Sequence, residues 1–279
     1  MQHKTFVPAV ALCIGAGGLL AAAPLWSAPN SQQRVAAFAK LPNWTGLWQA
    51  DLGGGGPPPG GGGNAGPGGA APGGTPIAGP PRAKLPFTPA WQAKIDAYHA
   101  ELEKYSGAEQ VPDNTVTECI WGIPRLFRGP YMFEVTVLPE QTFFNYDVIE
   151  YRHIWTDGRA HPKGAALKLT DTGHSIGHWE DGTLVIDTVG IKPLWVDGEG
   201  TTLSDQVHIV ERWKQLGPDR LQMDATISDP VALTQSYSVT NQYKRITDTN
   251  RMLQQNCFEN IHEVQEGDKV ITRFAPSKG

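Results

Sequence analysis

Four of the eight histidines of this chain lie in two neighbouring stretches, YRHIWTDGRAHP (151–162) and GHSIGHWEDGTLVIDT (173–188). Aspartates and glutamates are interspersed among them. Imidazole and carboxyl groups often transfer protons in enzymes, and imidazole is also a common metal ligand. These residue types therefore suggest either a catalytic or metal-binding cluster, or the polar edge of a β-sheet.

Residue alternation indicates which of these side chains share a face. In the segment IEYRHIW, the side chains of Tyr151, His153 and Trp155 fall on one face of an expected strand. Asp187 lies between two valines on its own face, and His208 shares a face with another valine. An imidazole or carboxyl group among apolar side chains has a shifted pKa and can act as a general acid or base. We therefore predict that His153 and Asp187 face a shared apolar cavity.

The candidate catalytic residues are the histidines of these segments together with one aspartate. They are His153, His161, His174, Asp187 and His208. The alternative interpretation is a structural network in which Asp187, Arg212 or His208 ties strands together. Both interpretations fit the sequence equally well.

Two other chemistries fit the pattern less well. His174 and His178 are four residues apart, but Gly177 and the nearby turn signals argue against a helix. On a strand, that spacing separates two side chains by about 13 Å, which is too far to bind one metal ion. Ser175 is the centre of GHSIG, which resembles a nucleophile elbow, but a hairpin is expected here where the elbow needs a following helix. We predict neither a metal site nor a nucleophilic serine.

Apolar and polar residues alternate with a period of two over much of the chain from residue 131 onward. Clear examples are YMFEVTVL (131–138), TFFNYDV (142–148), RLQMDATI (220–227) and QSYSVTNQY (235–243). Turn signals, among them Asp157-Gly158 and Asp181-Gly182, separate the runs. About eight to ten strands with one apolar face indicate an antiparallel meander that closes as a barrel or packs as a sandwich.

Aromatic side chains on the expected inward faces predict the ligand of such a barrel. The candidate ligand-binding residues are Tyr131, Phe133, Tyr151, Trp155 and Tyr237. A mostly apolar cavity lined by aromatic rings suits a small apolar or aromatic molecule.

The segment FTPAWQAKIDAYHAELEKY (87–105) has the period of an amphipathic helix. Thr88 suits the N-cap and Pro89 suits the first turn. Apolar residues recur at intervals of four, three and four residues from Trp91 to Leu102. We expect this helix to pack on the outside of the sheet.

The tripeptide GLW (46–48) resembles the Gly-x-Trp motif in the opening strand of lipocalins and related calycin barrels. An ordinary core tryptophan would explain it equally well. Together with the meander, the motif supports a mainly β fold, an antiparallel meander closing as a calycin- or lipocalin-like barrel with one outer amphipathic helix.

Six ordered segments between Trp44 and about Asn260 resemble a large group of exported bacterial proteins. The segments are WTGLW, CIWGIPR, WTDGRAHP, GHSIGHWEDGTLVIDTVG, SDQVHIVERW and CFEN. Where the group usually shows Trp-Glu-Gly-Asp-Thr-Leu, this chain has WEDGTL (179–184), which moves one carboxylate by one residue. The resemblance implies export and a compact β fold, and no particular activity.

Residues 1–28 have the pattern of an export signal, with one lysine, an apolar run and then small residues. A retained N-terminal anchor is the alternative. Signal removal would leave two cysteines, Cys119 and Cys257, and we predict a disulfide between them over two buried thiols. The expected location is periplasmic or secreted, with no integral membrane span after signal removal.

Composition and charge argue against some classes of partner and indicate how the chain divides into folded and disordered parts. The net charge of −5 is spread along the chain without a basic block, which argues against nucleic acid as a partner. The segment 53–81 consists almost entirely of glycine, proline and alanine, so we predict a disordered insertion. Residues 29–279 are otherwise expected to form a single barrel-like domain.

The sequence thus favours an exported enzyme that uses His/Asp acid–base chemistry on a small apolar or aromatic molecule, as an isomerase, lyase or hydratase would. No organic cofactor is expected, because no dinucleotide-binding or phosphate-loop glycine motif follows an expected strand. Two alternatives remain open. One is a lipocalin-like carrier without catalysis, and the other is a structural or interaction protein of the cell envelope or surface.

Overall fold

The computed structural model describes the central part of the chain and several flanking segments. The described residues are 31–51, 85–103, 110–112, 122–127, 131–148, 151–196, 200–247, 252, 261–266 and 269–274. The expected export signal (1–28), the Gly/Pro-rich segment 53–81 and the predicted Cys119–Cys257 disulfide lie outside these residues. Those three expectations stay predictions.

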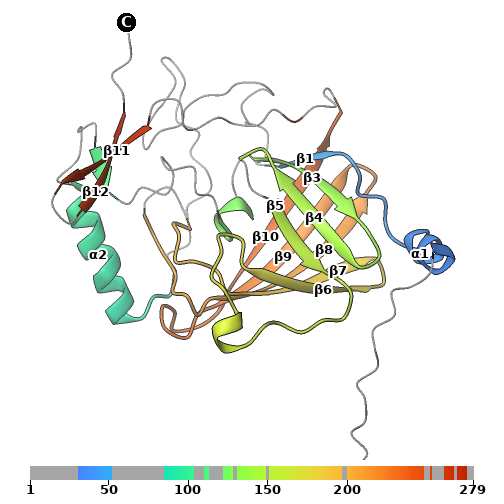
Figure 1. Cartoon of the computed structure of the whole chain (residues 1–279), viewed down its shortest axis with the longest axis horizontal. Helices are drawn as coiled ribbons and strands as arrows, with labels where there is room; N and C mark the ends of the chain where they lie inside the picture. Colours follow the sequence, from blue (N-terminus) through green and yellow to red (C-terminus); the bar gives the residue numbers. More distant parts are fainter. Residues whose placement is uncertain are drawn as a thin grey trace, which may run out of the picture.

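Nine strands form a closed barrel (Figure 1). They are β1 (Leu47–Ala50), β3 (Met132–Val137), β4 (Gln141–Tyr146), β5 (Tyr151–Trp155), β6 (His174–Glu180), β7 (Thr183–Val189), β8 (His208–Gly217), β9 (Arg220–Ser228) and β10 (Tyr237–Ile246). Around the barrel they follow the order β1-β10-β9-β8-β7-β6-β5-β4-β3, and β3 pairs with β1 to close it. The predicted mainly β, calycin-like barrel is confirmed.

The pairing departs from an antiparallel meander at one place. β5 and β6 run parallel, with only the pairs Ile154–Ser175 and Trp155–Ile176 in register. The prediction of a wholly antiparallel sheet is wrong here, because residues 156–173 do not form a tight hairpin. They return along the outside of the barrel and include the short 3-10 helix η2 (Gly164–Ala166). The β5–β6 seam is therefore the least extensively paired junction between consecutive barrel strands.

The expected turn between β6 and β7 is present. Asp181 and Gly182 have φ values of 46° and 78°, as a two-residue hairpin with both central residues in the left-handed region requires. The alternation predicted for 131–138 also holds, since Phe133, Val135 and Val137 are buried on β3 while the residues between them are exposed.

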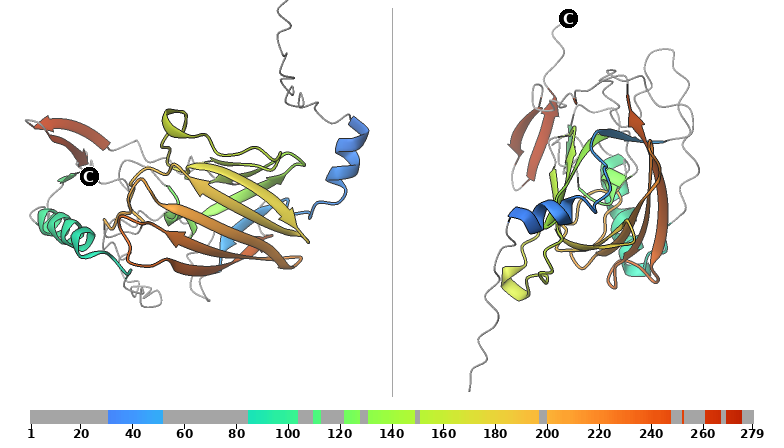
Figure 2. Two further views of the ribbon diagram at one scale, coloured as in Figure 1. Left: turned by 90° about the horizontal axis from the view of Figure 1, so that it is seen from below. Right: turned by 90° about the vertical axis from the view of Figure 1, so that its right-hand side faces the viewer.

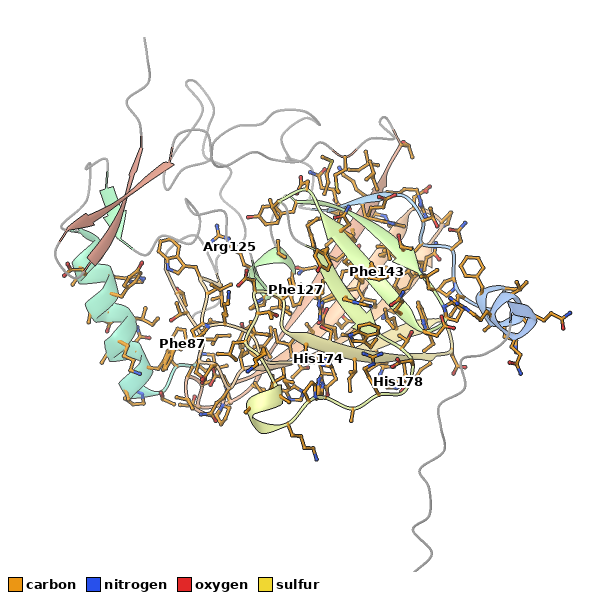
Figure 3. The ribbon with its side chains drawn as sticks, in the orientation of Figure 1. Phe87, Arg125, Phe127, Phe143, His174 and His178 are labelled. Carbon is orange, nitrogen blue, oxygen red and sulfur yellow. The ribbon has the colours of Figure 1, made fainter. Side chains whose placement is uncertain are left out.

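Aromatic side chains pack across the inside of the barrel. The ring of Trp213 lies 4.8 Å from Phe144, 5.0 Å from Tyr243 and 6.0 Å from Phe133, measured between ring centroids. The backbone carbonyl of Phe127, in the 3-10 helix η1 (Arg125–Phe127), accepts a hydrogen bond from the Tyr243 hydroxyl at 2.9 Å. Figure 3 shows η1 at the end of the barrel that faces α2. These rings occupy the lumen in which the sequence predicted a ligand.

Helix α2 (Pro89–Glu103) confirms the predicted helix, but it lies beyond one end of the barrel, next to the segment with Trp195 and Thr202, and not on the outer face of the sheet (Figure 1). The Thr88 hydroxyl accepts the Trp91 backbone N–H at 3.3 Å, which confirms Thr88 as the N-cap. A second helix, α1 (Ser31–Phe38), lies at the opposite end of the barrel and makes an ion pair from Arg34 to Glu140 (Figures 1 and 2). The sequence analysis did not predict α1.

A small second sheet has the order β11-β12-β2 and lies on the same side of the barrel as α2 (Figure 2). Its strands are β2 (Gln110–Pro112), β11 (Ile261–Glu266) and β12 (Lys269–Phe274). That residues 29–279 form one domain stays a prediction. Within the described residues, no helix is long and apolar enough to cross a membrane.

Candidate functional site

The two faces of β5 are the reverse of the predicted ones. Arg152 and Ile154 point into the barrel, with exposed fractions of 1% and 0%, whereas Tyr151 is 67% exposed. His153 and Trp155 therefore lie on the outer face. The predicted grouping of Tyr151, His153 and Trp155 on one face holds, but that face is the outer one. Alternation groups residues on a face without saying which face is inward.

Arg152 points into the barrel, where its guanidinium pairs with the buried carboxylate of Glu211. Its guanidinium binds both oxygens of Glu211, at 2.6 and 2.8 Å, and donates to Thr188 Oγ1 at 2.6 Å and to Ser175 Oγ at 3.1 Å. Burial alone would lower the pKa of Arg152, but Glu211 reverses this and the pKa is raised. Trp213 Nε1 also donates to Glu211, at 2.9 Å. We interpret this buried pair as structural. Ser175 is one of its hydrogen-bond partners.

Four of the five candidate catalytic residues meet on the outer face of β6, β7 and β8. His161 comes from the loop after β5, and its Nε2 lies 2.9 Å from Asp187 Oδ1. Its Nδ1 lies 2.8 Å from Nδ1 of His174. His208 Nε2 approaches the same oxygen of Asp187 at 3.0 Å. The result is a continuous chain of hydrogen bonds in the order His174, His161, Asp187, His208.

Asp187 is paired as predicted but not buried as predicted. Its side chain is 41% exposed, and its cross-strand neighbours on the outer face are Ile176 and Val210. The prediction of a shared apolar cavity for Asp187 and His153 is wrong for Asp187. It contacts the cavity only through His161 and His174.

The hydrogen positions along this series of hydrogen-bonded side chains follow from the Asp187 carboxylate. An ionised carboxylate only accepts hydrogen bonds, so His161 Nε2 must carry a hydrogen. In neutral His161, Nδ1 is then an acceptor, so Nδ1 of His174 must carry the hydrogen between the two rings. Nε2 of a neutral His174 is left with its lone pair. With His161 neutral, the Asp187–His161 pair thus selects the Nδ1–H tautomer of His174, whereas a protonated His161 would donate from Nδ1 and select the Nε2–H tautomer.

His153, the fifth candidate, lies on β5 in a stack of side chains. Its ring centroid lies 4.3 Å from that of Phe143 and 3.6 Å from that of Trp155, and the guanidinium carbon of Arg159 lies 3.5 Å from the Trp155 ring centroid. His153 Nε2 lies 2.8 Å from the amide oxygen of Gln141. Because that oxygen only accepts, Nε2 carries the hydrogen and Nδ1 of neutral His153 has the lone pair.

Burial favours the neutral form of both imidazoles. Burial lowers the pKa of His153, and the cationic Arg159 lowers it further. Burial likewise lowers the pKa of His174, with smaller effects from His161 and Arg159. A neutral imidazole can accept a proton at neutral pH. Arg159 is itself fixed by Asp157, which binds its side chain and its backbone N–H as an aspartate in a turn does.

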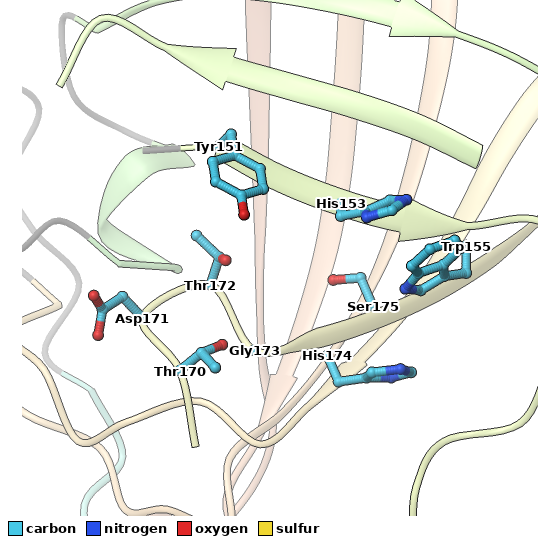
Figure 4. Close-up of a pocket in the computed structure, with 9 residues that line it drawn as sticks. All are labelled: Tyr151, His153, Trp155, Thr170, Asp171, Thr172, Gly173, His174 and Ser175. Carbon is cyan, nitrogen blue, oxygen red and sulfur yellow. The ribbon is translucent and has the colours of Figure 1, made fainter. Parts of the chain in front are cut away.

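A cavity of about 310 Å³ opens between β5 and the segment that leads into β6. Figure 4 shows His153 and His174 on two sides of it, and both line it together with Tyr151 and Trp155. The cavity exists because β5 and β6 pair over only two residues of each strand and separate beyond them. Its floor includes Gly173, which has a φ of 69°.

The predicted ligand-binding residues divide between the cavity and the barrel. Tyr151 and Trp155 line the cavity, Tyr131 and Phe133 are buried elsewhere, and Tyr237 is half-buried on β10. The sequence analysis missed the lining residues Thr170, Asp171 and Thr172, which precede β6. They carry no signal of their own beyond a cluster of turn-forming residues after a long connection.

His178 takes no part in this site. It lies at the surface, where its Nε2 is 2.8 Å from Glu180. Among the described residues, no group of three or more His, Cys, Asp or Glu side chains is arranged to hold a metal ion. The roles of the candidate catalytic residues stay predictions.

In comparisons with known proteins, no family model, no curated protein and no solved structure matches this chain. The class that the fold defines is a mainly β protein with a closed nine-stranded barrel. The resemblance to exported bacterial proteins stays a prediction.

Proposed function

We propose that this protein is an exported, cofactor-independent enzyme that performs acid–base chemistry on a small apolar or aromatic molecule at the β5–β6 cavity. One observation carries the proposal. The hydrogen-bond chain from Asp187 through His161 ends at His174, which lines the cavity. With His161 neutral, Nε2 of His174 keeps a lone pair that can accept a proton. A carboxylate that orients a histidine is a common way to prepare a general base.

The proposed base is Nε2 of His174. It takes a proton from a carbon next to a carbonyl group in the substrate. The hydrogen on its Nδ1 remains shared with His161, whose own contact with Asp187 stabilises the positive charge that develops. Return of the proton at another carbon gives an isomerase, and loss of a leaving group gives a lyase or, in reverse, a hydratase.

His153 is the second proton-transfer group of this proposal. Its Nδ1 lone pair belongs to a ring that lines the same cavity, and its pKa is lowered like that of His174. Once one imidazole is protonated, it can act as an acid while the other stays a base. Tyr151 adds a hydroxyl group that points toward the centre of the cavity (Figure 4).

A lipocalin-like carrier is the second candidate, supported by the closed barrel alone. Such a carrier holds its ligand inside the barrel. Here the rings of Phe133, Phe144, Trp213 and Tyr243 and the Arg152–Glu211 pair occupy the interior. This packing favours the outer cavity as the binding site. No described contact favours a structural protein of the envelope over these two.

Hydrogen–deuterium exchange tests the proposal without knowledge of the natural substrate. Aryl ketones and aldehydes with an acidic α-hydrogen are incubated with the protein in deuterium oxide, and deuterium uptake is followed by NMR. Uptake above background should occur with the wild type and be lost in His174→Ala. The matched control is His178→Ala, which removes a surface histidine and should keep full activity. Equal rates in all three proteins would contradict the enzyme proposal.

A further inference from the structure

A second cavity of about 290 Å³ lies between α2 and the segment that leads from β7 toward β8. Aromatic rings dominate its lining, with Trp91 and Tyr98 from the helix and Trp195 from the opposite side. The histidines of the first site do not take part in it. The two cavities share no lining residue, so we consider the ligand of this one separately.

The rings of this cavity are fixed in place by the protein. Trp91 Nε1 donates to the backbone carbonyl of Thr202 at 2.9 Å, which ties the helix to the opposite wall. The rings of Tyr98 and Trp195 meet edge to face, with centroids 5.9 Å apart. A ligand would therefore meet preformed aromatic surfaces and would not have to order them.

The charge of the cavity comes from one residue. Lys94 is the ionisable ammonium group of the lining, and its Nζ lies 4.5 Å from the Trp91 ring centroid. None of the ion pairs formed between described residues involves Lys94. Three aromatic rings alone would attract a cation. The ammonium of Lys94 already occupies one ring and repels a second cation, so the complementary charge is negative.

We propose that this cavity binds a small aromatic carboxylate, with the ring of the ligand among Trp91, Tyr98 and Trp195 and its carboxylate at Lys94. The volume is near the lower end of the range for small-molecule sites, which suits a molecule with one aromatic ring. The ammonium and the rings together provide the charge and the apolar surface that such a ligand needs.

This site is separate from the proposed catalytic cavity, but one segment connects the two. Lys192 forms an ion pair with Asp171 of the first cavity, at 2.8 Å, and Pro193 and Trp195 line the second. The inference does not depend on the proposed enzyme activity. Binding at the second cavity can be measured whether or not the first cavity is catalytic.

Three probes that differ only in charge test the proposal. They are para-fluorophenylacetate, the corresponding alcohol and the corresponding amine, and their binding to the full chain at neutral pH is followed by fluorine NMR. The carboxylate should bind most tightly and the amine least. Lys94→Gln should weaken carboxylate binding about fivefold, as expected for one exposed charge pair, and leave the alcohol unchanged.

Control variants separate this site from other surfaces. Lys244→Gln removes another exposed lysine, on β10, and should have no effect. Trp195→Leu should weaken the carboxylate and the alcohol alike, and His174→Ala should weaken neither. Circular dichroism checks that each variant is folded. The proposal is overturned if binding does not saturate, if the amine binds best, or if folded Lys94→Gln keeps the preference for the carboxylate.

Discussion

His174 owes its proposed chemistry to residues that do not line the cavity. His161 contacts it directly, and Asp187 acts one step further away through His161. Asp187 also accepts a hydrogen bond from His208, so a single carboxylate oxygen orients two imidazoles. The positions of these residues could be selected from the sequence by residue type. Their contacts could not, because His161 comes from a loop whose path has no periodic signal.

Replacing Asp187 by asparagine should separate catalysis from stability. The amide keeps the shape of the side chain but removes the charge that fixes His161 and stabilises protonated His174. Exchange activity should fall on the order of 100-fold, the usual contribution of a positioned acid–base group. Because Asp187 is 41% exposed, the free energy of unfolding should change by less than about 1 kcal/mol.

Glu180→Gln is the matched control for this experiment. Glu180 also accepts from a histidine, His178, but this pair lies away from the cavity. Its activity should equal that of the wild type. If both variants lose the same activity, or if Asp187→Asn loses stability and no activity, Asp187 has a structural role only.

At the level of β5, the sequence was informative about spacing and uninformative about direction. The alternation in IEYRHIW is real, but arginine is the residue that enters the barrel. An arginine is expected at the surface unless it is paired. Its partner Glu211 is 59 residues away in the chain, on β8, so only the closed sheet shows that the two side chains meet.

Breaking the buried Arg152–Glu211 pair should strongly destabilise the barrel. Glu211→Gln leaves a buried guanidinium without its counter-charge and should lower the free energy of unfolding by about 3–5 kcal/mol. The double variant Arg152→Met, Glu211→Leu removes both charges and should recover much of this loss. Urea denaturation measures both. A double variant that is less stable than Glu211→Gln would mean that the polar network stabilises the fold beyond its charge balance.

The floor of the cavity depends on a glycine just before β6. A Cβ atom at Gly173 would lie 2.7 Å from Ile191, 2.8 Å from Thr188 and 2.8 Å from the carbonyl oxygen of Val189. With a φ of 69°, Gly173→Ala should therefore cost more than about 2 kcal/mol and disturb His174 next to it. Thermal unfolding and deuterium exchange measure the two effects.

Gly182 provides the comparison for this variant. Its φ is 78°, but a Cβ atom there meets nothing within 4 Å. Gly182→Ala should cost only the backbone term, about 1 kcal/mol, and keep activity. Equal losses for the two variants would show that the close contacts of Gly173 do not determine the shape of the cavity.

For the molecule as a whole, the strands and the barrel could be predicted from alternation and turn residues, whereas the location of the site could not. The aromatic rings that pack around Trp213 fill the lumen. The cavity therefore lies on the outside of the barrel, and tertiary packing of this kind cannot be read from the sequence. The parallel β5–β6 seam that creates the cavity was missed because Asp157-Gly158 predicts a turn. Asp157 and Gly158 form a bend, but the chain continues past it as a long connection to β6.

A buried carboxyl group should make the stability of the whole fold depend on pH. Asp147 is 3% exposed, its Oδ1 has no hydrogen-bond partner, and burial raises its pKa to about 6. The folded state therefore holds this proton more tightly than the unfolded state does. Its contribution favours folding at low pH and is lost as the pH rises from about 4 to about 6.

Asp147→Asn removes the ionisable group and tests this effect by difference. The variant should be more stable than the wild type above pH 6, by up to about 3 kcal/mol, and the difference should shrink toward pH 4. Exposed Asp205→Asn should show no such trend. A difference that is constant over this pH range would contradict the raised pKa of Asp147.

The central claim is that Asp187, acting through His161, presents His174 to the cavity as a neutral base with its hydrogen on Nδ1. Nitrogen NMR of the histidine side chains measures this directly, because it identifies which nitrogen of each ring carries a hydrogen and follows the titration of each ring. The account predicts that His174 is an Nδ1–H tautomer with a pKa below the usual histidine value of about 6.5. An Nε2–H tautomer, or a His174 pKa at or above that value, would contradict it.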